Sequence, residues 1–275
     1  MKAKLLLAVL LAAVMLAGTA HAGFISMLGE DGQVWNLDTS SKQASKTVKF
    51  TDPPGSNEQQ YNPNALGVSG GSYFYTNYNV SGADTLYRDG TPLYTIGGLG
   101  DWNIANGDAF GSYFHFVDRY TGNFYTISNI FGDPGTQSMT SAYVGGSNTM
   151  GDIAINGQKA YLSYDNALAT FNTNDPYNFT SVTRDRFVGL AFDGDSLYGV
   201  RRVGDNNFDL YSINTDTLAA TLLGDITGLD TAGGAVAGKY EITDAARAVP
   251  IPAAAWLFGS GLVGLAALKR KVRKK

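Results

Sequence analysis

Cysteine is absent from the 275-residue chain. This absence excludes disulfides, a cysteine nucleophile and cysteine-ligated metal centres. Histidine is nearly absent, because only His115 lies beyond the first 22 residues. A zinc site built from several histidines is therefore excluded, and a Ser-His-Asp arrangement would depend on that one residue. His115 lies in the strand-like pattern GSYFHFV, so we expect a hydrogen-bonded or solvent-facing strand residue.

Glutamate is scarce, with Glu30, Glu58 and Glu241 as its only occurrences. Aspartate is frequent and falls mostly in turns, such as DGD from Asp193. Side-chain hydrogen bonds to the local backbone explain an aspartate in a turn without any catalytic role. No spacing in the sequence identifies a catalytic carboxylate pair.

The first 22 residues have the three parts of a signal peptide. Lys2 and Lys4 form a basic start, residues 5–17 are apolar, and Ala20 and Ala22 frame a small-x-small cleavage site. These features predict export through the Sec translocon and cleavage by signal peptidase. The mature chain is expected to begin at Gly23.

The other end of the chain predicts a short membrane-spanning helix. Residues 253–268 carry no charge, and a helix of that length covers about 24 Å of a hydrocarbon core of about 30 Å. The chain then closes with six basic residues and no acid, namely Lys269, Arg270, Lys271, Arg273, Lys274 and Lys275. By the positive-inside rule, residues 269–275 form a cytoplasmic tail and the main domain lies outside.

A proline-containing motif precedes this helix, and residues 247–252 form the motif with its linker. The chain reads VPIPAAAWLFGSGLVGL from Val249. This sequence resembles the VPxPA variant of the PEP-CTERM sorting signal. The match runs through Val249, Pro250, Ile251 and Pro252 and continues in the helix with Ala253, Trp256, Gly259, Ser260, Gly261 and Gly264.

The resemblance implies that an exosortase recognises the motif and cleaves the tail. The protein would be held briefly in the inner membrane of a Gram-negative bacterium and then reach the cell surface or the medium, with exopolysaccharide as an associated partner. Proline keeps the motif extended and outside the helix, which suits a protease cleft. The commoner signal has Glu where this chain has Ile251, which leaves the exosortase subtype open. A permanent anchor without processing is the alternative.

The exported domain is strongly acidic. Two of the 20 basic residues lie in the signal peptide and six in the tail, whereas all 24 acidic residues lie between them, so residues 23–268 have a net charge of −12. This balance argues against nucleic acid as a partner.

Two aromatic markers repeat along residues 23–246, each with a mean period of roughly 42 residues, which is the size of a four-stranded propeller blade. Tyrosine strands that follow a small turn occur at Tyr73, Tyr113, Tyr161, Tyr198 and Tyr240. Aromatic strands that end in a turn occur at Trp35, Tyr87, Tyr125, Phe171 and Tyr211.

The best-preserved unit runs from Val188 to Gly224 and contains GLAFDGDSLYGV and DLYSINTDTLAATLLG. It resembles the blades of YVTN- and NHL-type β-propellers. We therefore predict an all-β propeller of about five four-stranded blades, with a β-sandwich or jelly roll as the alternative. One blade is expected to combine the N-terminal aromatic strand with the C-terminal strand at Tyr240, which would hide two sheet edges.

Residues 205–216 have part of the pattern of a calcium loop. Asp205, Asn207 and Asp209 place oxygen atoms at alternating positions, and Asp216 falls twelfth. Leu210 stands where the loop needs glycine, and Asp216 is shorter than the usual bidentate Glu. Calcium is therefore an imperfect candidate, and the sequence predicts no other cofactor.

Four aromatic residues in loop-like stretches are candidate platforms for sugars: Tyr61, Tyr78, Trp102 and Tyr177. The expected function is that of a non-enzymatic surface or matrix protein that binds a ligand. The alternative is an exported hydrolase, lactonase-like or glycosidase-like, which would need at least two carboxylates and a cation at the mouth of the central channel.

Overall fold

The structure is a computed structural model. It describes residues 23–29, 31–50, 62–78, 83–97, 99, 104, 106–144, 151–164, 166–204, 207–229 and 242–248. The predicted signal peptide, sorting motif, membrane helix and basic tail lie outside these residues. Within the described ranges, no helix is long and apolar enough to span a bilayer.

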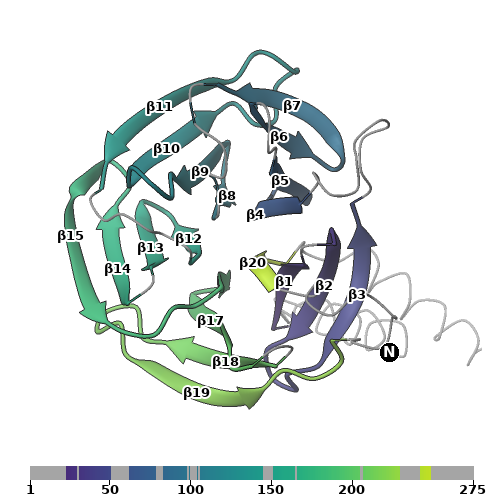
Figure 1. Ribbon diagram of the computed structural model, residues 1–275, viewed down its shortest axis with the longest axis vertical. Helices are drawn as coiled ribbons and strands as arrows, with labels where there is room; N and C mark the ends of the chain where they lie inside the picture. Colours follow the sequence, from purple (N-terminus) through teal and green to yellow (C-terminus); the bar gives the residue numbers. More distant parts are fainter. Residues whose placement is uncertain are drawn as a thin grey trace, which may run out of the picture.

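Five four-stranded antiparallel sheets are arranged as blades around a common axis (Figure 1). From the axis outward, blade 1 contains β20 (Ile242–Arg247), β1 (Phe24–Gly29), β2 (Gln33–Asp38) and β3 (Ala44–Lys49). Blade 2 contains β4 (Asn62–Ser69), β5 (Ser72–Tyr78), β6 (Asp84–Arg88) and β7 (Thr91–Ile96). Blade 3 contains β8 (Asp108–Phe110), β9 (Tyr113–Val117), β10 (Asn123–Ser128) and β11 (Ser138–Tyr143).

Blade 4 contains β12 (Ile153–Asn156), β13 (Lys159–Tyr164), β14 (Ala167–Asn172) and β15 (Asp175–Thr183). Blade 5 contains β16 (Gly189–Asp193), β17 (Ser196–Arg202), β18 (Phe208–Ile213) and β19 (Ala220–Asp225). The predicted five-bladed all-β propeller is confirmed, and the sandwich alternative is excluded. All five predicted aromatic markers lie in the third strand of a blade, from Trp35 in β2 to Tyr211 in β18.

The ring is closed by strands from both ends of the domain, as expected, but the closing strand has a different place from the predicted one. β20 begins at Ile242 and is the innermost strand of blade 1, where it pairs with β1. The second position, which holds tyrosine strands in the other blades, is taken by β1. Tyr240 lies outside the described residues. The tyrosine period misplaced the closure because β1, with the sequence FISMLG, carries no tyrosine.

The two faces of the ring differ in the length of their connections. Each inner strand of blades 2 to 5 joins its neighbour through two residues, the first of which is a glycine with positive φ: Gly70, Gly111, Gly157 and Gly194. Two-residue hairpins favour such glycines because their twist matches that of the strands. We call this side the turn face. The opposite side, the loop face, carries the connections from each outer strand to the next blade, such as residues 184–188.

The hydrophobic core is divided among the five blade interfaces. One cluster joins blades 1 and 5 around Trp35 and Leu210, and another joins blades 4 and 5 around Tyr161 and Phe192. Three further clusters fill the remaining interfaces. Alternating side chains on each strand reach both neighbouring blades, so each blade depends on the next one for burial. Closure of the ring therefore also determines the positions of the residues along its axis.

Candidate functional site

The axis of the ring is lined by the five innermost strands, and polar side chains stand at or near the start of four of them. These are Asn64 in β4, Asp108 in β8, Asp152 immediately before β12 and Asp244 in β20. The fifth strand, β16, begins with Gly189. The three aspartates are buried, so their oxygen atoms need partners within the protein.

Asp152 shows how these side chains are satisfied. Its Oδ1 accepts a hydrogen bond from the backbone amide of Ile153 at 2.6 Å. Its Oδ2 accepts from Leu190 in blade 5 at 2.6 Å and from Ala245 in blade 1 at 3.1 Å. One carboxyl group thus connects three blades through backbone amides.

The other three side chains also reach the following blade. Asp244 Oδ2 accepts from the amide of Leu66 at 2.8 Å, Asp108 Oδ2 accepts from the amide of Ile155 at 2.7 Å, and Asn64 Nδ2 donates to the carbonyl of Ile104 at 3.2 Å. These contacts and those of Asp152 form a ring of polar fasteners, which we call the axial clasp: Asn64, Asp108, Asp152 and Asp244.

Blade 5 contributes no side chain to the axial clasp, and packing gives the reason. A Cβ atom on Gly189 would lie 2.7 Å from the Cβ of Ala245 and 3.2 Å from its backbone nitrogen. β16 therefore approaches β20 too closely for any side chain at this position. Asp152 compensates, because it reaches past Gly189 to the amide of Ala245.

Asp152 and Asp244 form a carboxyl pair within the clasp. Their side chains hydrogen-bond to each other, and both residues have no exposed surface. Asp244 Oδ1 is buried and has no hydrogen-bond partner among the described residues. Burial raises the pKa of Asp152 to about 8. Burial and the neighbouring Asp152 raise the pKa of Asp244 well above its usual value. The pair therefore holds at least one proton at neutral pH.

Asp108 lies in a second layer, nearer the turn face, together with Arg247. Burial raises the pKa of Asp108 to about 7, and the charge of Arg247 and two backbone amides oppose this shift. The Nη2 of Arg247 donates to the carbonyl of Ile155 at 2.6 Å, and its guanidinium lies 5.0 Å from the ring centre of Phe110. Arg247 thus extends from β20 to blades 3 and 4 across the axis.

This geometry suits a structural role, in which the carboxyl groups join neighbouring blades, better than catalysis. The central carboxyl groups of the hydrolase alternative are present, but their oxygen atoms already accept backbone hydrogen bonds. Asp152 and Asp244 have no solvent-exposed surface through which a substrate could approach. A general acid must come within hydrogen-bond reach of its substrate. Within the described residues, no group of three or more acidic or histidine side chains is placed to hold a metal ion.

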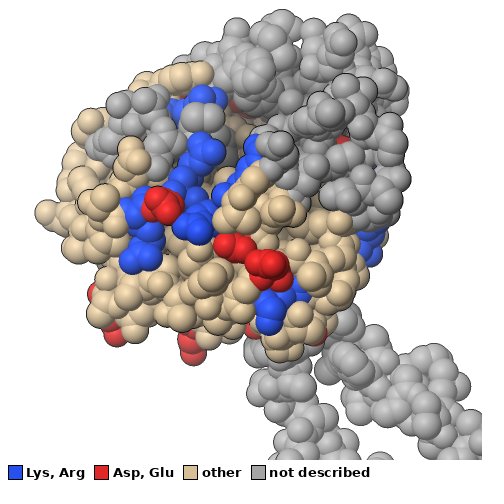
Figure 2. Space-filling view, turned by 60° about the horizontal axis from the view of Figure 1, so that its bottom comes forward, with Lys and Arg blue, Asp and Glu red and all other residues tan. Residues whose placement is uncertain are grey.

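A group of charged side chains lies on blade 5 at the loop face. Arg201 Nη1 pairs with Asp185 at 2.7 Å, its Nη2 lies 3.8 Å from Asp209, and its guanidinium is 4.9 Å from the ring centre of Tyr211. Figure 2 shows acidic side chains next to basic ones on the side of the molecule that is turned forward there. The charges of Arg201 are therefore balanced locally, and this contact network joins the start of blade 5 to β17 and β18.

A shallow, open depression of about 360 Å³ lies on blade 4. It is lined by Asn156, Gln158, Lys159, Thr170, Phe171 and Asn172. Lys159 Nζ donates to the carbonyl of Thr215 at 3.1 Å, so the one charged group of the depression is tied to blade 5. The depression contains no acid–base pair.

The calcium candidate is not assembled among the described residues. Asp209 lies at the start of β18, while Asp216 lies in the turn beyond the other end of that strand. The four residue steps of strand from Asp209 to Ile213 alone span about 13 Å. Asn207 accepts a hydrogen bond from Val203 in the turn between β17 and β18, and Asp205 is outside the described residues. Asp209 and Asp216 therefore face different ends of blade 5.

Of the four predicted aromatic platforms, two lie among the described residues. Tyr177 is 65% exposed, but it lies in β15 and not in a loop. Tyr78 ends β5, and Tyr61 and Trp102 lie outside the described residues. His115 is a buried strand residue in β9 whose Nδ1 lies 3.0 Å from Thr126 Oγ1. Burial lowers the pKa of His115 to about 4, so its ring is neutral at physiological pH.

Sequence reasoning missed the axial clasp. It interpreted the aspartates as turn residues, although Asp108 and Asp152 introduce inner strands. A signal was available, because Gly-Asp precedes a small or branched apolar residue in both NGDAF and GDIAI. Asp244 in ITDAAR and Asn64 in NPNALGV occupy similar local sequences.

The fold and the clasp define a five-bladed β-propeller closed by a C-terminal inner strand. No family model and no curated protein matches the sequence. Among solved structures, the chain is similar to part of a nidogen/laminin complex, with 9% identity, 82% of this chain and 98% of that chain covered, and a TM-score of 0.44. It is also similar to U3-55K, with 12% identity, coverage of 74% and 63%, and a TM-score of 0.43.

A third similar structure is a candidate 6-phosphogluconolactonase from Bacteroides uniformis, with 15% identity, coverage of 76% and 69%, and a TM-score of 0.40. Identities in this range indicate the fold alone. The function of this chain must therefore be argued from its own residues.

Proposed function

We propose that this chain is an exported, non-enzymatic propeller that binds a ligand at the cell envelope. In this proposal, the segment after the propeller tethers it to the inner membrane, and an exosortase cleaves at the motif of residues 249–252. The signal peptide and the sorting motif, both interpreted from sequence, define the route. The propeller supplies the binding domain.

The position of the two ends of the domain carries the proposal. Ile25 and Arg247 are direct partners across the β1–β20 ladder, and both lie at the turn face. The closed ring therefore begins just after Gly23, the predicted first residue of the mature chain, and ends just before Val249, the first residue of the motif. A tether at Ala248 would leave the opposite loop face directed away from the membrane.

The absence of catalysis in this proposal rests on the axial clasp. The carboxyl groups nearest the axis are used to join blades, and their burial separates them from solvent. Binding would then fall to the outer surface and the loop face. A polysaccharide partner is proposed from the sorting-signal resemblance, and exposed Tyr177 is compatible with stacking on a sugar ring.

Intact mass of the protein from the envelope and medium of its producing organism tests this function. We expect a chain that starts at Gly23 and ends near Pro250. Replacing Pro250 and Pro252 together by Ala should remove the extended motif and leave a chain that retains Lys275.

Pro134→Ala, in an exposed turn between β10 and β11, is the matched control and should be processed normally. If the unaltered protein retains Lys275 in every fraction, exosortase processing is wrong and the tail is a permanent anchor. If the double variant is processed like the control, the motif is not the recognition site.

A further inference from the structure

The outermost strand of each blade has one open edge, and these five edges differ in how they are protected. An open edge presents unpaired backbone groups to which another strand can pair, and natural sheets protect such edges with lysine, proline or a bulge. Because the five blades are structurally equivalent, they serve as controls for one another. Three of the five outer strands are protected: β3, β7 and β19.

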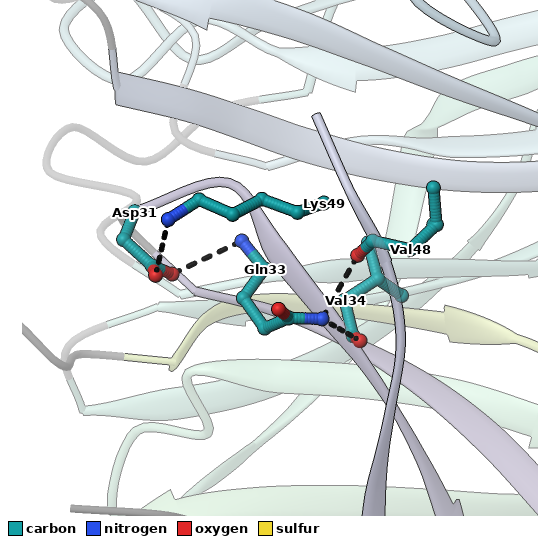
Figure 3. Close-up of polar contacts among 5 residues, drawn as sticks. All are labelled: Asp31, Gln33, Val34, Val48 and Lys49. Carbon is teal, nitrogen blue, oxygen red and sulfur yellow. Dashed lines mark hydrogen bonds and ion pairs between the residues drawn. The ribbon is translucent and has the colours of Figure 1, made fainter. Parts of the chain in front are cut away.

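β3 carries the strongest protection. Lys46 and Lys49 lie on it, and its register with β2 shifts between Gln33 and Trp35. Figure 3 shows Lys49 paired with Asp31, a contact of 3.2 Å, and the Nε2 of Gln33 bonded to the carbonyl of Val48 at 3.0 Å. Charge and bulge together make this edge a poor template for another strand.

β7 and β19 are protected by irregular backbone. β7 contains Pro92, and its register with β6 shifts between Leu86 and Tyr87. β19 has a register shift opposite Leu210, with Gly224 at a φ of 129°, and it ends at Asp225. A bulge turns the edge and interrupts its row of hydrogen-bonding groups.

β11 and β15 lack this protection over their regular stretches. β11 pairs with β10 through six consecutive residues and carries no charge or proline. β15 is the longest described strand, with nine residues, and its protective features, namely Asp175, Pro176 and one register shift, all lie before Phe179. Residues 179–183 then pair regularly and carry no charge. Two aromatic side chains of β15 are exposed, Tyr177 by 65% and Phe179 by 44%.

The open edge of β15 has a defined row of donors and acceptors. Arg184, directly after the strand, donates its backbone amide to Asn166 next to β14 at 3.0 Å. Alternate residues of an antiparallel strand direct their backbone groups to opposite sides. Phe179, Ser181 and Thr183 therefore direct their amides and carbonyls away from β14.

The uncharged composition of that edge and the symmetry of its pairing favour a second copy of this chain as the occupant. Residues 23–268 carry a net charge of −12, so two copies repel each other least where they meet through an uncharged surface. Residues 179–183 are such a surface. Antiparallel pairing of one segment with itself is also self-complementary, as a two-fold interface requires.

We propose that the propeller forms a two-fold dimer in which β15 pairs antiparallel with β15 of a second copy. The axis passes at Ser181, the middle of residues 179–183, so Ser181 faces Ser181 of the other copy and Phe179 faces its Thr183. In this register, each of the three outward-directed residues forms a hydrogen-bonded pair with an outward-directed residue of the second copy. The two fourth blades become one continuous eight-stranded sheet.

The dimer is independent of tail processing but compatible with a shared membrane. In Figure 1, β15 runs around the rim of the ring, with β14 directly inside it. A two-fold axis normal to the sheet at β15 is therefore nearly parallel to the axis of the ring. The two propellers lie side by side, with both turn faces on the same side.

The lack of cysteine makes a direct test possible in the full-length chain. Ser181→Cys, Ser141→Cys and Ser45→Cys each place one thiol on an exposed position of β15, β11 and β3, respectively. Opposed Cα atoms about 5.5 Å apart in a hydrogen-bonded pair suit a disulfide. After oxidation of membranes that contain the full chain, we expect Ser181→Cys to give roughly tenfold more covalent dimer than the other two.

A charge at the same edge is the complementary test. Residues 23–248 contain all five sheets, so the closed domain is suited to mass measurement by light scattering. Ser181→Lys should convert dimer to monomer, whereas Ser141→Lys should leave the dimer intact, with both variants unfolding at the same temperature as the parent. A parent domain that is monomeric at every concentration, or a dimer cross-linked equally at position 141 or 45, would overturn the proposal.

Discussion

Replacing Asp152 by Ala is expected to lower the free energy of unfolding by about 4–6 kcal/mol. The change removes the acceptor of three backbone amides, those of Ile153, Leu190 and Ala245. Each buried donor left without a partner costs about 1–3 kcal/mol. These amides belong to three blades, so the loss weakens the ring at the junction where β20 closes it.

The measurement is equilibrium denaturation of residues 23–248. Asp216→Ala, in an exposed turn after β18, is the matched control and should change stability by less than about 0.5 kcal/mol. The loss of stability for Asp152→Asn should lie between those of Asp152→Ala and Asp216→Ala, because the amide oxygen of Asn replaces only one of the two carboxyl acceptors. A loss below about 1 kcal/mol for Asp152→Ala would mean that the three amides find other partners, and the clasp would not be a main support of the ring.

The blade pattern could be predicted from sequence because it depends on local spacing. Turn glycines such as Gly157 and Gly194 recur in blades 2 to 5, and aromatic residues such as Phe171 recur in the third strand of every blade. Each has the same physical role in every blade, so the period survives although the sequences differ. The aromatic third strands were therefore placed correctly.

The closing blade was predicted only in part because closure is not a local property. β20 pairs with β1 across more than 200 positions of the sequence. Its strand pattern, ITDAAR, contains small residues that fit the narrow centre of the ring. The marker used for prediction, Tyr240, belongs to the preceding segment. Small inner-strand residues would have been the better guide.

The axial clasp was missed for a related reason. An aspartate in a turn and an aspartate that begins an inner strand look alike in sequence, since both follow glycine or another small residue. What distinguishes Asp152 is the approach of β16 and β20, which brings the amides of Leu190 and Ala245 within reach. That proximity exists only after the ring has closed.

The stability of the domain is expected to fall as pH rises from 6.5 to 9. Burial raises the pKa of Asp108 to about 7 and that of Asp152 to about 8, and burial together with the neighbouring Asp152 raises the pKa of Asp244 well above its usual value. In the unfolded chain, aspartate loses its proton near pH 4. The folded state therefore keeps protons that the unfolded state has released, and raising the pH favours unfolding.

The predicted fall in stability is limited to pH values above 6.5 because, below that value, the titration of His115 changes stability in the opposite direction. Burial lowers the pKa of His115 to about 4. Between this value and its usual pKa near 6.5, His115 binds a proton in the unfolded state but not in the folded state. Stability therefore falls as the pH decreases through this range. Above pH 6.5 this opposing contribution is absent.

Asp244→Asn should make the fall of stability with pH shallower, since it removes one linked proton. The amide oxygen can accept from Leu66, and the amide NH2 can donate to Asp152 in place of the carboxyl proton. Relative to the parent, the variant should therefore become more stable as the pH rises through this range. Denaturation curves at intervals of half a pH unit measure this slope.

Asp108→Asn provides the internal comparison for the same experiment. Its carboxyl group has a pKa of about 7 in the folded state. The plot of stability against pH should therefore be shallower for this variant than for the parent only in the lower part of the pH range, and the two plots should be parallel above it. Asp108→Asn also places an NH2 group against the amide of Ala109 or Ile155, which lowers stability at every pH without changing the slope. Equal slopes for the parent and Asp244→Asn would show that the axial pair does not share a proton, and Asp152 and Asp244 would then have to be ionised together in the closed ring.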